Sequence, residues 1–149
     1  TYRYGAHIPW YESLDAPGAF QVGYLRRLME SRPFLSRIPD QSVLASDPGS
    51  GDAHLQATRD QLGRFLMVYS PMGKPITVRT SSLKGKVFRA WWFDPRLGEA
   101  KSLGDDFQGD VLTFEPPSQG EDCDWVLVLD SADERFPVPG TKPYEGNRS

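Results

Sequence analysis

The chain has 149 residues, a formal net charge of -3 and one cysteine, Cys123. This length predicts one domain with a hydrophobic core, and the slight acidity provides no field that attracts nucleic acid or anionic lipid. One cysteine excludes an intrachain disulfide and a cysteine-based zinc cluster. No apolar run approaches the roughly 18 residues of a membrane-spanning helix. We therefore expect neither nucleic acid nor a membrane as a partner.

Residues 15–32 predict an amphipathic helix. Their apolar members recur every three or four positions, whereas Arg26 and Arg27 fall on another face. The helix is expected to end before the proline at position 33, because the residue before a proline is pushed out of the α region. We expect the side chains of Leu25, Leu28 and Met29 either to dock on the rest of the chain or to mediate a dimer.

The remainder of the chain shows the short periods of β-strands. Residues 36–52 are rich in proline and glycine and predict a linker or an ordered loop. Apolar runs separated by turn residues then predict strands at 54–60, 64–70, 75–80, 86–94, 99–103, 111–115 and 124–130. Continuously apolar runs within two of them are typical of strands covered on both faces. These strands predict a mainly β fold, an antiparallel two-sheet β-sandwich of about seven strands preceded by the N-terminal helix.

The predicted strand 86–94 carries two adjacent tryptophans, Trp91 and Trp92. Neighbouring side chains on a strand point to opposite faces of the sheet. One indole therefore belongs to the core, and the other lies on the outer sheet face or at a domain contact. The favoured interpretation is that both are structural. The alternative is that one of them is an exposed platform on which a carbohydrate ring stacks.

Acidic residues gather in two predicted loops. Their members are Asp105, Asp106 and Asp110 in the first, and Glu121, Asp122 and Asp124 in the second. Two such loops could supply the six to eight oxygens of a calcium site. Neither has the pattern of an EF-hand, so we favour solvated loops and predict no metal ligands.

No motif in the chain predicts catalysis. A glycosidase needs two carboxyl groups held about 5–10 Å apart, and no sequence context here indicates such a pair. A phosphate loop, a metalloprotease helix and a nucleophile elbow are also absent from the sequence. We therefore predict no catalytic residue and no cofactor. The alternative is a small glycosidase whose site lies around His7, Glu12 and Asp15.

The first eleven residues are rich in amphipathic aromatic side chains, among them Tyr4, His7 and Trp10. Such a density is typical of a pocket wall or an interface, where rings bury area and keep a polar group. Two interpretations remain open. The rings either fill the seam between the helix and the sandwich, or line a ligand cleft that is completed by protein outside this chain.

Six short motifs follow one another in a distinctive order. They are YGAH at 4–7, LDAPGAFQVGYLRRLMESRPF at 14–34, IPDQSVL at 38–44, ATRD at 57–60, VFRAWWFDPRLGEA at 87–100 and DWVLVLD at 124–130. Their succession resembles the C-terminal part of an apiosidase-like bacterial glycoside hydrolase. In that family a (β/α)8 barrel is followed by a β-sandwich that is labelled as a collagen-binding domain.

The resemblance implies how the chain is divided. Residues 1–40 would be the terminal strand-loop and helix of the barrel, 41–53 a linker, 54–130 the accessory sandwich and 131–149 a mobile tail. Catalytic carboxylates of such barrels lie at the ends of earlier strands, so the chain would lack them. This division agrees with the absence of an initiator methionine, which is expected of an internal or processed piece.

The resemblance also implies the function, the partners and the location. The chain would be a non-catalytic accessory domain of a secreted or periplasmic carbohydrate-active enzyme, with the barrel as its partner and a polysaccharide as a further one. Tyr4, His7 and Trp10 would contact sugar, although the stretch between YGAH and LDAPGA is shorter than the family pattern. The alternatives are an extracellular collagen-type protein-binding module and the small glycosidase.

Overall fold

The computed structural model describes residues 22–45, 55–120, 123–141 and 144. One α-helix, α1 (Val22–Glu30), precedes the strands in this part of the chain, and the short 3-10 helices are η2 (Phe34–Ser36), η3 (Gln41–Val43) and η5 (Ala132–Glu134). The strands are β1 (Arg37–Pro39), β2 (Gln56–Asp60), β3 (Phe65–Ser70), β4 (Ile76–Arg79), β5 (Phe88–Asp94), β6 (Glu99–Phe107), β7 (Val111–Phe114) and β8 (Trp125–Ser131). No helix in the described ranges has both the length and the apolar composition needed to cross a bilayer.

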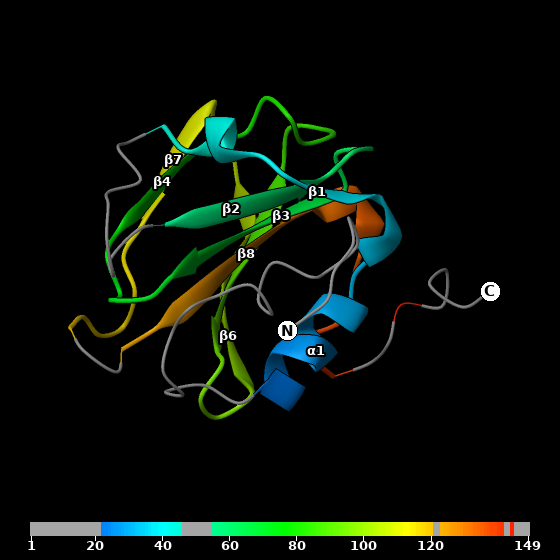
Figure 1. Cartoon of the computed structure of the whole chain (residues 1–149). Coiled ribbons are helices and arrows are strands. Elements are labelled where there is room, and N and C mark those ends of the chain that lie inside the picture. The colour runs from blue at the N-terminus through cyan, green and yellow to red at the C-terminus, as the bar shows by residue number, and fades with distance from the viewer. Residues whose placement is uncertain (1–21, 46–54, 121–122, 142–143, 145–149) are drawn as a thin grey trace.

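The strands form two antiparallel sheets, which confirms the predicted mainly β sandwich. The larger sheet has the order β1-β2-β3-β8-β5-β6, and the smaller consists of β4 and β7 (Figure 1). All seven predicted strands occur within a few residues of their expected bounds. The eighth, β1, pairs with β2 from Arg37 opposite Asp60 to Pro39 opposite Thr58. Three residues are too few to show a period of two, and Pro39 is tolerated because β1 is an edge strand.

Strands β3, β8 and β5 lie in the middle of the larger sheet and are buried on both faces. Along β8, Trp125, Leu127 and Leu129 join one apolar cluster, whereas Val126 and Val128 join another. Alternation on a strand explains this division, since successive side chains point to opposite faces. The prediction from the two continuously apolar runs is therefore confirmed.

The first cluster fills the space between the two sheets, and we call it the inner core. Trp92 from β5 packs edge-to-face on Trp125 from β8, with 6.4 Å between the ring centroids. The smaller sheet contributes Ile76, Val78 and Phe114. Val43 and Leu44 are also buried there. Of the two forms predicted for residues 36–52, a linker or an ordered loop, this part is the ordered loop. Each buried aliphatic or aromatic side chain contributes roughly 1.5–3 kcal/mol through removal of its surface from water.

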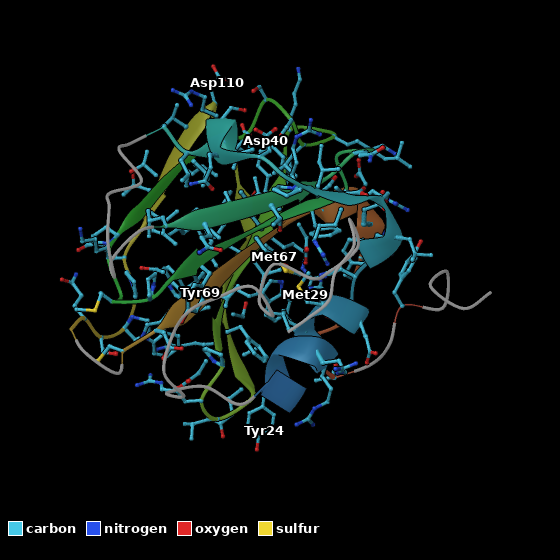
Figure 2. The ribbon with its side chains drawn as sticks, viewed as in Figure 1. Tyr24, Met29, Asp40, Met67, Tyr69 and Asp110 are labelled. Atoms are coloured by element: carbon cyan, nitrogen blue, oxygen red, sulfur yellow. The ribbon has the colours of Figure 1, made fainter. Side chains whose placement is uncertain are left out.

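The second cluster covers the opposite face of the larger sheet, and we call it the outer layer. It consists of Leu28 and Met29 from α1, Phe65, Met67 and Tyr69 from β3, Trp91 and Phe93 from β5, Val126 and Val128 from β8, and Phe136. Figure 2 shows Met29 on α1 and Met67 on the sheet beside it. The helix thus docks on the sandwich, as expected for Leu28 and Met29, while the side chain of Leu25 lies outside the described residues.

Part of the predicted tail also belongs to the outer layer. Phe136 is 4% exposed, and its ring lies 6.3 Å from Phe65 and 5.8 Å from Tyr144, both edge-to-face. The backbone N–H of Tyr144 donates to the carbonyl of Glu30 at the end of α1. These residues are therefore ordered against the fold, because aromatic rings gain free energy by burial even in a proline-rich segment. The domain boundaries themselves stay a prediction.

The turn between β5 and β6 contacts the start of this helix. Gly98 has a φ of +72°, and a Cβ placed there would lie 2.5 Å from the ring of Tyr24. The close approach to α1 therefore requires glycine for two reasons, the left-handed backbone conformation and the missing side chain.

Gly98→Ala is expected to destabilise the chain more than Gly85→Ala. Gly85 has a similar φ of +75°, but the nearest atom to a Cβ placed there belongs to the flexible Asp133 carboxylate, at 3.2 Å. Both variants should lose about 1–2 kcal/mol to the left-handed conformation, and only Gly98→Ala should lose about 1–3 kcal/mol more through overpacking against Tyr24. Urea unfolding of the two variants measures the difference. Equal losses would show that the Tyr24 contact contributes nothing.

Candidate functional site

Seven of the residues singled out from the sequence lie outside the described residues. Tyr4, His7 and Trp10 are nominated for sugar contact, and Glu12 and Asp15 form the alternative catalytic group with His7. The other two are Glu121 and Asp122 of the second acidic group. Their roles stay predictions.

The tryptophan pair lies within the described residues, and both indoles are buried. Trp91 is 5% exposed in the outer layer and Trp92 is 1% exposed in the inner core. The alternative that one of them is an exposed platform for a carbohydrate ring is therefore wrong, because a sugar ring can stack only on an indole face that solvent reaches. The larger sheet is covered on both faces where these two side chains lie, so the outer sheet face expected for one of them is itself an apolar layer.

The two acidic groups differ from each other. Asp105, Asp106 and Asp110 are exposed, although the first two lie on β6 rather than in a loop. Asp124, by contrast, is 2% exposed at the start of β8. Within the described ranges, no three His, Cys, Asp or Glu side chains come close enough together to hold a metal ion.

A buried ion pair joins the end of α1 to the end of β8. Arg32 follows the helix, and its Nε and Nη2 donate to the two carboxylate oxygens of Asp130 at 3.0 and 2.8 Å. Trp91 Nε1 donates to the same carboxylate at 3.2 Å. Both charged side chains have 0% exposure. Arg32 also donates to the carbonyl of Ser31 at 3.0 Å and lies over the ring of Phe136.

Burial dominates the electrostatics of this pair. It raises the pKa of the Asp130 carboxyl and lowers the pKa of the Arg32 guanidinium, while the attraction and the hydrogen bonds between the two groups act against both changes. A fork-to-fork arginine–carboxylate contact is among the strongest charge-assisted hydrogen bonds. We therefore assign the charged form of both groups at neutral pH.

A second charged cluster lies at the opposite end of β8. Arg96 Nε is 3.1 Å from Asp94 Oδ1 and 3.5 Å from Asp124 Oδ1. The backbone N–H of Arg96 also donates to Asp94, which fixes the turn after β5. Tyr69 Oη on β3 donates to Asp124 Oδ2 at 3.3 Å (Figure 2 shows Tyr69). Burial raises the pKa of Asp124 and also that of Tyr69, where the carboxylate adds to the effect.

Both clusters connect segments that are distant in the sequence, and in each an arginine nitrogen lies within 4 Å of every carboxylate. Sequence reasoning missed Arg32, which falls at the end of an amphipathic helix where exposed arginines are common. It also gave Asp130 no role beyond that of the last residue of the predicted strand 124–130. Only the alternation along DWVLVLD carried a signal, because it places Asp130 on the same face as Val126 and Val128.

The raised pKa of Asp124 predicts how stability depends on pH. The folded chain binds this proton more tightly than the unfolded chain, whose value is the ordinary 3.8. The contribution of Asp124 to the free energy of unfolding should therefore be largest below that value and fall as pH rises through the raised folded pKa. Asp124→Asn lacks this fall, so its stability relative to the parent chain should rise over the same window.

Urea unfolding at a series of pH values from 4 upward measures this difference. Asp105→Asn, which removes an exposed charge, is the matched control. Parallel stability curves for the parent chain and Asp124→Asn would contradict the prediction.

The chain is similar to a family model and to several known proteins. A family model described as "Putative collagen-binding domain of a collagenase" matches residues 38–130. The structure is similar to that of a glycoside hydrolase, with 36% identity and a TM-score of 0.71 over 87% of this chain and 29% of that chain. It is also similar to a glycoside hydrolase family 5 protein from Bacteroides vulgatus ATCC 8482, with 30% identity and a TM-score of 0.74 over 90% of this chain and 28% of that chain.

A curated relative, "Elongation factor G 2" of Syntrophus aciditrophicus (strain SB), is 29% identical over 109 residues, which are 72% of this chain and 16% of that protein. The chain thus spans less than a third of each of the three proteins. The family match and the two structures fit a C-terminal domain of a glycoside hydrolase, which confirms the resemblance drawn from the short motifs.

Proposed function

Because the chain belongs to the family described as the collagen-binding domain of a collagenase, and is similar to parts of two glycoside hydrolases, we propose that it is a non-catalytic accessory domain of such an enzyme. In this proposal the sandwich follows the catalytic (β/α)8 barrel and supports it. The observation that carries the proposal is the outer layer. Helix α1 lies before residue 38, where the family match begins, and yet Leu28 and Met29 bury themselves on the matched sheet.

Both faces of the larger sheet are covered by other parts of the chain, and this favours a structural role for the sandwich. One face of the larger sheet packs on β4 and β7, and the other packs on the upstream helix and on Phe136. The large side chains of this sheet are therefore buried in packing contacts, where a ligand does not reach them. The exposed large apolar side chains among those described are Leu35, Leu62, Leu97, Val111 and Val138, and none of these carries an aromatic ring for stacking.

The buried carboxylates support the absence of catalysis. Four aspartates are buried in the described part of the chain, and each has an arginine nitrogen within 4 Å: Asp60, Asp94, Asp124 and Asp130. A glycosidase needs one carboxyl group that stays protonated as an acid and a second that acts as base or nucleophile. An adjacent arginine favours the ionised form, and it opposes the rise in pKa that burial causes at Asp124 and Asp130. This arrangement suits a scaffold rather than an acid–base pair.

The proposal includes the partners and the location. The barrel is the partner, Tyr4, His7 and Trp10 contact sugar in the cleft that the barrel completes, and the protein is secreted or periplasmic. The glycoside hydrolases that resemble the chain support this view, since their substrates are carbohydrates.

Two assays test the proposal. The chain alone should hydrolyse no aryl glycoside or polysaccharide, whereas the protein that includes the upstream sequence of its gene should do so and should lose thermal stability when the sandwich is deleted. Hydrolysis by the chain alone that Glu12→Gln abolishes would overturn the proposal in favour of the small glycosidase.

The description of the family favours a second candidate function, the binding of collagen. Recognition of a triple helix needs a long groove that matches a rod. We expect no retention of the chain on immobilised triple-helical peptide above that of an unrelated β-sandwich. Retention that competes with soluble triple-helical peptide would make this the function instead.

A further inference from the structure

The buried ion pair spans the junction between the matched domain and the segment before it. Arg32 lies upstream of residue 38, and Asp130 is the last residue of the family match. Their side chains meet across 98 positions of sequence, at 0% exposure on both sides. Trp91, in the middle of the larger sheet, donates to the same carboxylate. Three elements, the end of α1, β5 and β8, therefore converge on one group.

Stability alone is a poor explanation for this pair. Removing two charges from water costs several kcal/mol per ion, so a buried ion pair is often no more stabilising than well-packed apolar residues of the same volume. The neighbouring contacts already supply apolar burial, since Leu28 is 0% and Met29 3% exposed. Burial of apolar surface is non-directional, however, and such contacts could tolerate rotation of the helix or its shift along the sheet.

The geometry of the pair supplies the missing direction. Two nitrogens of the Arg32 guanidinium donate to the two oxygens of Asp130, and Trp91 Nε1 donates to one of these oxygens from the sheet. A helix rotated or shifted by one turn would separate the two charges and leave the buried Asp130 carboxylate with the Trp91 donor but no arginine, at a cost of several kcal/mol. The ion pair thus excludes alternative positions of α1 more strongly than it stabilises the observed one.

We propose that Arg32 and Asp130, with Trp91, act as a register lock that fixes the position of α1 on the sandwich. Arg32 is a positioning residue in this role. Where α1 continues into the catalytic barrel, the lock sets the orientation of the sandwich relative to that barrel; this last step rests on the proposed function, whereas the lock itself does not.

The test measures the position of α1 in the chain itself. In a Cys123→Ser background, spin labels at Arg27→Cys on α1 and Lys101→Cys on β6, both exposed positions, report the distance between helix and sheet. The parent chain should give one narrow distance distribution. Arg32→Met/Asp130→Leu, which replaces the pair by apolar side chains, should keep cooperative unfolding with a melting temperature within a few degrees and give a broad or split distribution.

Further variants complete the design. Arg32→Lys keeps the charge but loses the fork, and should also broaden the distribution. Backbone amides of α1 should exchange at least tenfold faster in the double variant, while those of β3 and β8 keep their protection. Arg59→Met, which breaks the partly exposed pair with Asp40, is the control and should leave the distribution narrow.

A single narrow distribution in both Arg32 variants would overturn the inference, because the apolar contacts would then set the register unaided. Complete loss of the fold in the double variant would overturn it too, since a register lock is not needed for folding. None of these readouts requires a barrel or any enzymatic activity. The register lock can therefore be disproved while the proposed function stands, and the proposed function can be disproved while the register lock stands.

Discussion

Trp92→Ala is expected to destabilise the sandwich by about 3–5 kcal/mol, the cost typical of truncating a large core aromatic. The side chain is 1% exposed and packs between the two sheets on Trp125, so its removal leaves a cavity that the surrounding strands cannot close. Since a domain of this size is stable by only about 5–15 kcal/mol, the variant should be marginal. Urea unfolding followed by tryptophan fluorescence and circular dichroism measures the loss.

Phenylalanine at the two tryptophan positions gives the matched control. Trp92 Nε1 is buried with no hydrogen-bond partner in the described part of the chain, whereas Trp91 Nε1 donates to Asp130. Trp91→Phe removes that donor from a buried charge, and Trp92→Phe removes a donor that binds nothing. Trp91→Phe should therefore cost about 1–3 kcal/mol more than Trp92→Phe. The reverse order would mean that the bond to Asp130 does not hold the carboxylate.

The sandwich was predictable because its strands carry strong local signals. The runs FLMVY at 65–69 and WVLVL at 125–129 are continuously apolar, and both belong to central strands buried on two faces. The turn after β5 was readable in the same way, because Asp94 and Gly98 are the residues that such a reversal requires. The short β1 was missed because its place in the sheet depends on pairing with β2, from which residues 40–55 separate it.

The charged residues of the candidate site were much less predictable. Arg32 and Asp130 look like exposed polar ends of a helix and a strand, and only the packing of α1 on the sheet buries them together. Arg26 and Arg27, a few positions earlier, have the same chemistry and are exposed. What separates these arginines is their position around the helix axis relative to a surface that the sequence does not locate. The same limitation made Asp124 appear to be a member of a solvated loop.

Leu28→Ala is expected to destabilise the whole described fold by about 2–5 kcal/mol. Leu28 is fully buried in the outer layer, between α1 and the central strands. If the sandwich were stable without the helix, weakening the contacts of α1 would leave the two sheets folded. The pair of Arg32 with Asp130 and the bond from Tyr144 to Glu30 argue instead that helix, sheet and C-terminal segment unfold together.

Two probes in the same urea titration distinguish these possibilities. Far-ultraviolet circular dichroism reports the helix and the sheets, and tryptophan fluorescence reports the sandwich, through Trp92 and Trp125 in the inner core and Trp91 on the other face of the larger sheet. We expect both signals of Leu28→Ala to shift to lower urea by the same amount, whereas Leu97→Ala, at a side chain 60% exposed in the turn after β5, should leave both within about 0.5 kcal/mol of the parent chain. A fluorescence transition that Leu28→Ala leaves unmoved would show that the sandwich is stable without α1. In that case the helix would not transmit support from this domain to the module before it, and the accessory role would have to rest on some other contact.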